Sequence, residues 1–303
     1  MLEKRDFYFK EAEDNRPLHI YLPVDYENSQ ESYPVMYFFD GHNLFRDDYA
    51  TYGTSWGLSG YLDSIQAKII IVGMECGHQG NVRLEEYSPY DLENTPVGPI
   101  HGRGHATMEW IVNEIKPMID ENYRTLPDRD HTGIGGSSMG GLMSFYGAIA
   151  YHDVFSKAAC LSSSFLFAPE DVINEIKKGP SLDDSRIYLS FGSHELDENI
   201  DSADLWASPL AKIHSQVNEA LFIKGAHTYL YMQLNGKHSE AYWRKQNDLL
   251  KRAEYHVHSS DMGVDECPLT DSEYKTEQPS GCFHLPSQQS SCCSRTEASS
   301  SIT

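Results

Sequence analysis

Strand-length apolar runs alternate with helix-length segments along most of this chain, and this alternation restricts the possible folds more than any other feature. Residues 67–74 form an apolar run interrupted only by Lys68, as expected of a strand buried on both faces. Residues 107–123 carry apolar side chains from Met108 to Met118 at spacings of 3, 4 and 3, which places them on one face of a helix. Strands joined by helices form right-handed crossovers. The sequence therefore predicts an α/β fold with a mostly parallel central sheet flanked by helices.

Other segments fit the same alternation. The predicted strands are 16–24, 34–40, 67–74, 131–135, 157–165, 186–192 and 228–236. The predicted helices are 107–123, 140–151, 208–222 and 239–255. Pro117 is expected to kink or shorten the first of these helices, because proline has no backbone N–H.

The composition changes near residue 257. From residue 258 onward serine is frequent, apolar periodicity disappears, and four cysteines follow (Cys267, Cys282, Cys292 and Cys293). These cysteines form no C-x-x-C pair, which disfavours a metal or redox site. Such a segment has too little apolar surface to offset the entropy of ordering it. We therefore predict a globular domain over 1–257 and a serine-rich, disordered tail over 258–303.

The net charge and the cysteine content limit which partners and which cellular compartment fit this chain. The chain has 24 basic and 45 acidic residues, a net charge of −21, which disfavours nucleic acid and acidic membrane surfaces as partners. The first residues are too charged for a signal peptide, and no apolar run is long enough to span a bilayer. Within 1–257 there are only two cysteines, Cys76 and Cys160. These features predict a cytoplasmic protein.

Residues 136–141 read Gly-Ser-Ser-Met-Gly-Gly and fit the pattern G-x-S-x-G. A strand precedes this motif and a helix follows it, which is the context of a nucleophile elbow. Glycine is needed there because side chains at those positions would clash with the neighbouring strand or helix. The motif predicts Ser138 as a nucleophile and the backbone N–H of Met139 as an oxyanion donor.

A serine nucleophile needs a general base, and His238 fits this role best. In this architecture the acid and then the histidine follow the serine, each on a loop after a later strand. His238 directly follows the predicted strand 228–236. By contrast, His227 precedes that strand, and His194 is too close to the acid loop to act with it.

The acid is expected in the loop after strand 186–192. Glu195 comes three residues after Gly192 and is our first choice. Asp197 is the alternative, and Glu198 is expected to be solvated. The lengths of the two side chains do not separate Glu195 from Asp197.

The second oxyanion donor is expected in the loop after strand 34–40. Gly41 permits a tight turn there, and the backbone N–H of His42 is the predicted donor. No second histidine stands at ligand spacing from His42, so the sequence predicts no metal at this site and no cofactor.

At this point the chain resembles the esterases of the esterase D and enterochelin-esterase type, within the α/β-hydrolases. The resemblance covers about residues 15–250 and is carried by PVMYFFDGHNLF, TYGTSWGL, RLEEYSPY, YRTLPDRDHTGIGGSSMGGL, LSSSFLF, YLSFGSHE and GKHSEAYWRK. It implies an α/β-hydrolase domain without a large lid. It also implies Ser138 as nucleophile, Glu195 and His238 as its partners, and His42 as an oxyanion donor.

The chain departs from this family at residues 162–166. Relatives often read Ser-Pro-Ser-Phe-Trp where this chain reads Ser-Ser-Ser-Phe-Leu, which removes a flat aromatic surface for a sugar or aromatic acyl group. Trp56 and Phe165 remain candidates for substrate binding, with core packing at least as good an interpretation. Arg83 either anchors an anionic substrate group or, as the safer expectation, pairs with Glu85 or Glu86.

These observations favour a serine carboxylic-ester hydrolase that acts on small soluble esters through an acyl-enzyme. Two alternatives stay open: an acyltransferase that uses the same residues, and a non-catalytic binding module of the same fold. The predicted partner is a small-molecule ester, and the oligomeric state is not predicted.

Overall fold

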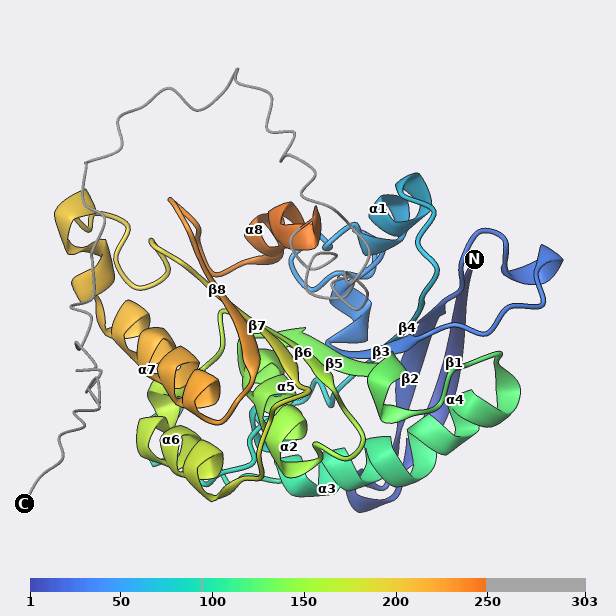
Figure 1. Ribbon diagram of the computed structural model, residues 1–303, viewed down its shortest axis with the longest axis horizontal. Helices are drawn as coiled ribbons and strands as arrows, with labels where there is room; N and C mark the ends of the chain where they lie inside the picture. Colours follow the sequence, from blue (N-terminus) through green and yellow to red (C-terminus); the bar gives the residue numbers. More distant parts are fainter. Residues whose placement is uncertain (94, 249–303) are drawn as a thin grey trace, which may run out of the picture. The chain divides into compact units, whose positions relative to one another are not determined.

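A computed structural model describes residues 1–93 and 95–248, and within them a single eight-stranded sheet crosses the domain (Figure 1). The strands lie in the order β1-β2-β4-β3-β5-β6-β7-β8. Their bounds are Leu2–Phe9 (β1), Asp14–Tyr21 (β2), Val35–Phe39 (β3), Ile70–Met74 (β4), Thr132–Ser137 (β5), Lys157–Leu161 (β6), Arg186–Gly192 (β7) and His227–Gln233 (β8). β3 to β8 are parallel, whereas β2 is antiparallel to both β1 and β4. The predicted mostly parallel sheet of an α/β-hydrolase is confirmed.

Helices cover both faces of this sheet. They are Leu58–Ser64 (α1), Val82–Glu86 (α2), Gly104–Trp110 (α3), Lys116–Asn122 (α4), Met139–Ala150 (α5), Pro169–Lys178 (α6), Pro209–Ile223 (α7) and Glu240–Trp243 (α8). The larger core cluster joins one face of the sheet to α3, α4, α5, α6 and α7. The smaller one joins the other face to α1 and α8, which lie on the opposite side in Figure 1. Burial on both faces explains why the central strands are continuous apolar runs.

Pro117 lies inside a continuous helical stretch from Gly104 to Asn122, so it does not shorten the helix. It is the second residue of α4, and the five residues before α4, Ile111–Ile115, form a π-helical segment that continues α3. Proline cannot donate to the carbonyl four residues earlier and its ring crowds that group. A π-helical turn at this point absorbs the mismatch.

Several elements were not predicted. β1 has a charged pattern and lies at the edge of the sheet, where one face stays solvated, so it shows no apolar run. α1, α2 and α6 are short helices of 7, 5 and 10 residues. The predicted helix 239–255 is described only to residue 248, where α8 is followed by the 3-10 turn Arg244–Gln246. The predicted tail over 258–303 lies outside the described residues.

The helices and the two cysteines can be compared with the sequence analysis. Among the described residues no helix is both long and apolar enough to cross a membrane. Cys76 and Cys160 are free and buried, and burial raises the pKa of both thiols, which keeps them protonated and unreactive. Cytoplasmic localisation itself stays a prediction.

His214, in the buried face of α7, should make the stability of the domain depend on pH. Its Nδ1–H donates to the Leu210 carbonyl at 2.9 Å, and its Nε2 is buried without a partner in the described part of the chain. Burial lowers the pKa of His214 from 6.5 to about 4. The unfolded chain therefore binds more protons than the native protein between these pH values, and stability falls as the pH falls. We expect a loss of about 2–3 kcal/mol in the free energy of unfolding between pH 7 and pH 4 from this group.

Urea unfolding at both pH values, in the wild type and in His214→Asn, checks this expectation. Asparagine keeps a donor for the Leu210 carbonyl but does not titrate, so the variant should show a shallower pH dependence whatever its absolute stability. An equal dependence of the free energy of unfolding on pH in the two proteins would contradict the assignment of this effect to His214.

Candidate active site

Ser138 lies in a sharp turn between β5 and α5. Its backbone has φ 59° and ψ −122°, a strained conformation for a residue with a side chain. A Cβ added at Gly136 would lie 2.7 Å from the backbone of Gly140, so the turn can close only with glycine there. Met139 is the first residue of α5, where helix amides have no intrahelical partner. This is the geometry of a nucleophile elbow.

Glu195 and His238 meet at the same edge of the sheet, on the loops that follow β7 and β8. The Nδ1 atom of His238 lies 2.9 Å from Oε2 of Glu195. The Glu195 side chain is 4% exposed and the His238 side chain 40%, so the acid is enclosed while the imidazole faces the pocket opening. With the carboxylate accepting the Nδ1–H, the neutral imidazole of His238 has its lone pair on Nε2.

The other two carboxylates of this loop lie elsewhere. Asp197 is exposed and accepts a hydrogen bond from the backbone N–H of Asn199 at 2.8 Å. Glu198 forms an ion pair with Lys237 at 2.7 Å on the surface. The geometry therefore favours Glu195 over Asp197 as the partner of His238.

A hydrogen-bond network that the sequence did not predict holds Glu195 in place. The second carboxylate oxygen accepts from the backbone N–H of Gly192 at 2.5 Å and from the hydroxyl of Ser162 at 2.6 Å. The Ser162 hydroxyl in turn accepts from the indole N–H of Trp243 at 2.8 Å, and the Trp243 ring meets the His238 ring edge-on. Connected donors of this kind fix the orientation of a buried carboxylate.

His42 lies in the turn that follows β3. Asp40 has a φ of 58°, and residues Gly41–Asn43 form a 3-10 turn. A Cβ added at Gly41 would lie 2.4 Å from the backbone of Gly73 in β4, so this loop packs closely against the sheet. The turn brings His42 to the pocket that Ser138 lines.

Arg83 holds this turn through a bidentate ion pair with Asp40. Its Nε and Nη2 atoms each lie 2.7 Å from a carboxylate oxygen of Asp40. Burial opposes ionisation of Asp40, but the Arg83 guanidinium outweighs it and lowers the pKa of this carboxyl below its usual value.

The predicted pairing of Arg83 with Glu85 or Glu86 is therefore wrong. Glu85 pairs with Arg103 at 3.0 Å, and Glu86 pairs with the buried Arg16 at 2.6 Å. Arg83 instead pairs with Asp40, a carboxylate distant in sequence, because Asp40 directly follows β3 and lies close to Arg83 in the fold.

Ser138 and His238 line one pocket of about 350 Å³. The Ser138 hydroxyl lies 3.4 Å from that of Ser164, a long contact between two hydroxyls. The other residues that line this pocket are mostly polar: Asp40, His42, Asn43, Thr51, Tyr52, Gly77, His78, Gly80, Arg83, Ser137, Glu240 and Trp243.

The two aromatic candidates for substrate binding do not line this pocket. Trp56 is 2% exposed and packs against Phe38 and Trp243 in the smaller core cluster. Phe165 is 0% exposed and packs against Phe145. Core packing, the alternative interpretation, accounts for both residues. Trp243 is the tryptophan at the pocket, and the sequence did not single it out.

The fold and the elbow together define an α/β-hydrolase. The family model described as "Putative esterase" matches residues 10–250, so the chain belongs to this esterase family and is a carboxylic ester hydrolase. The uncharacterized protein YbbA of Bacillus subtilis is 25% identical over 240 residues, which cover 77% of this chain and 89% of YbbA.

Solved structures share the fold at low sequence identity. A ferulic acid esterase superposes with a TM-score of 0.62 at 17% identity, covering 84% of this chain and 97% of the other. An IroE-like serine hydrolase from Shewanella oneidensis also has a TM-score of 0.62, at 18% identity, covering 82% of this chain and 80% of the other. These likenesses show a common architecture.

Proposed function

We propose that this protein hydrolyses small soluble carboxylic esters through a catalytic triad of Ser138, Glu195 and His238. The observation that carries the proposal is the 2.9 Å hydrogen bond between Glu195 and His238, at a pocket that Ser138 also lines from a strained elbow. A base oriented by a buried carboxylate, next to a serine at a helix N-terminus, is the arrangement that acyl transfer requires.

In the proposed reaction His238 takes the hydroxyl proton of Ser138 as Ser138 Oγ attacks the ester carbonyl. The amides of Met139 and His42 stabilise the negative charge on the carbonyl oxygen. His238 then gives the proton to the leaving alcohol, which leaves an acyl group on Ser138. Water, deprotonated by His238, releases the carboxylic acid and restores the serine. The Ser138 hydroxyl contacts Ser164 at 3.4 Å, and in the proposed reaction it turns to donate to His238 once substrate is bound, as catalytic hydrogen bonds often form only then.

The pocket supports a preference for short acyl chains. It measures about 350 Å³ and has mainly polar walls, so a long alkyl chain would remain in water. Each CH₂ group contributes about 0.8 kcal/mol only where an apolar surface buries it. We expect kcat/KM for acetyl to butyryl p-nitrophenyl esters to exceed that for a dodecanoyl ester by about tenfold or more.

A series of p-nitrophenyl esters that differ only in acyl length measures this preference, below the concentration at which the long esters form micelles. The leaving group is constant, so differences report the acyl site. A maximum at twelve carbons or more would contradict the proposed substrate size and leave the triad to be tested separately.

A further inference from the structure

Three metal-ligating side chains that the proposed reaction does not use lie close together, and two of them, His42 and His78, also line the pocket of Ser138 and His238. One ring nitrogen of His42, one of His78 and a carboxylate oxygen of Glu75 all lie within 4.8 Å of one another. His42 comes after β3 and Glu75 directly after β4, and these strands are parallel neighbours. The sheet therefore brings together residues whose separation in sequence hides any ligand spacing.

His42 has a nitrogen available for a ligand. The residue is 8% exposed, and its Nε2 lies 3.0 Å from the Thr51 hydroxyl. Its Nδ1 is buried and has no hydrogen-bond partner among the residues that the structure describes. A buried polar atom without a partner is costly, and a metal ion would satisfy it. In the tautomer in which Nε2–H donates to the Thr51 hydroxyl, Nδ1 has its lone pair available for a metal ion.

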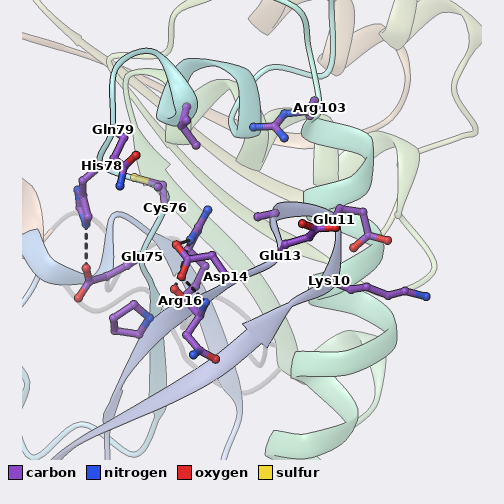
Figure 2. Close-up of a pocket in the computed structure, with 15 residues that line it drawn as sticks. Lys10, Glu11, Glu13, Asp14, Arg16, Glu75, Cys76, His78, Gln79 and Arg103 are labelled. Atoms are coloured by element: carbon purple, nitrogen blue, oxygen red, sulfur yellow. Dashed lines mark hydrogen bonds and ion pairs between the residues drawn. The ribbon is translucent and has the colours of Figure 1, made fainter.

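Glu75 and His78 complete the set. Figure 2 shows their side chains pointing toward one another, with His78 Nε2 2.9 Å from Oε2 of Glu75. The other oxygen, Oε1, accepts from the buried His19 at 2.6 Å and from Lys4 at 3.2 Å. These outer contacts orient the carboxylate as they do in metal sites. His78 is 56% exposed in its side chain and so has room to adjust.

We propose that His42, Glu75 and His78 bind one divalent transition-metal ion, zinc by preference. Two imidazoles and a carboxylate suit zinc, whose ligand atoms at about 2.0–2.2 Å lie about 3.3 Å apart in a tetrahedron. The three ligand atoms lie within 4.8 Å of one another, so the side chains, the exposed His78 among them, would have to move closer together around the ion. The fourth position takes water or an oxygen of a bound molecule. This proposal does not depend on the proposed esterase reaction.

Zinc titration by isothermal calorimetry of the full chain, freed of metal with a chelator, tests the site. The variants are His78→Ala, which removes an exposed ligand, and His131→Ala as a matched control. His131 also pairs with a carboxylate three residues away, Asp128, but belongs to no three-ligand cluster among the described residues. The cysteines and histidines beyond residue 248 are the same in every protein, so the difference between variants reports this cluster.

We expect the wild type and His131→Ala to bind one more zinc ion than His78→Ala, or to bind that ion at least about 100-fold more tightly. Glu75→Gln should lose the same ion, with the melting temperature checked because Glu75 also accepts from His19. Cobalt in place of zinc should give the visible bands of a tetrahedral site in the wild type and lose them in His78→Ala.

Two results would overturn the proposal. One is equal stoichiometry and affinity in the wild type and His78→Ala. The other is an ion that disappears in His238→Ala but persists in His78→Ala, which would place it on the proposed catalytic histidine.

Discussion

Replacing Ser138 with alanine should lower kcat for a p-nitrophenyl acetate substrate by about 10⁴–10⁶-fold. The proposed acyl-enzyme forms only on this hydroxyl, and His238 and Glu195 act only through it. The residual rate would come from the amides of Met139 and His42, which still polarise a bound carbonyl. Steady-state kinetics with purified protein measures the loss.

Ser164→Ala is the matched control for this substitution. The Ser164 hydroxyl is the one that contacts Ser138, so the control removes the same chemical group from the neighbouring serine. It should change kcat by less than about tenfold, because Ser164 takes no part in proton transfer. Both variants should keep the wild-type melting temperature to within a few degrees. Equal losses of activity in the two variants would contradict the assignment of Ser138 as the nucleophile.

Replacing Glu195 with glutamine should lower kcat by about 10³–10⁴-fold. A glutamine amide at this position can donate to His238 Nδ1 and select the wrong tautomer, and it does not stabilise the imidazolium that forms during attack. The Gly192 amide and the Ser162 hydroxyl still find an acceptor in the glutamine oxygen, so the loop should keep its conformation. Kinetics with the same ester and circular dichroism check both statements.

Asp197→Asn is the control that separates the two candidate acids. It makes the same chemical change two residues further on, at an exposed side chain. It should leave kcat within about threefold of the wild type, as expected of a surface position outside the proton path. A larger loss in Asp197→Asn than in Glu195→Gln would show that the acid is Asp197.

The sequence predicts the central part of the fold well. β3, β4, β6 and β7 are buried along most or all of their length, so their apolar runs identify them without any knowledge of contacts. β1 was missed for the opposite reason: it is an edge strand with one solvated face, and its residues Glu3, Lys4 and Arg5 hide the pattern.

Some residues of the candidate site can also be predicted from the sequence, whereas their contacts across the sheet cannot. Ser138, His238 and Glu195 stand at fixed places relative to strand ends, so chain order and the glycine motif find them. The partners of Arg83 and His42 depend on which strands are neighbours, and β3 lies between β4 and β5 although β4 follows β3 in the chain. The contacts of Asp40 with Arg83 and of His78 with His42 therefore depend on the order of the strands in the sheet. No local sequence pattern predicts either contact.

Intact-mass measurement after treatment with an organophosphonate tests the central claim, that Ser138 forms a covalent acyl-enzyme, most directly. Such a reagent phosphonylates an activated serine, with loss of its leaving group, and spares ordinary serines. We expect the wild type to gain one phosphonyl group, on the tryptic peptide that contains Ser138, and Ser138→Ala to gain none. A wild type that remains unlabelled and also fails to hydrolyse small esters would contradict the claim and leave a non-catalytic binding module of this fold.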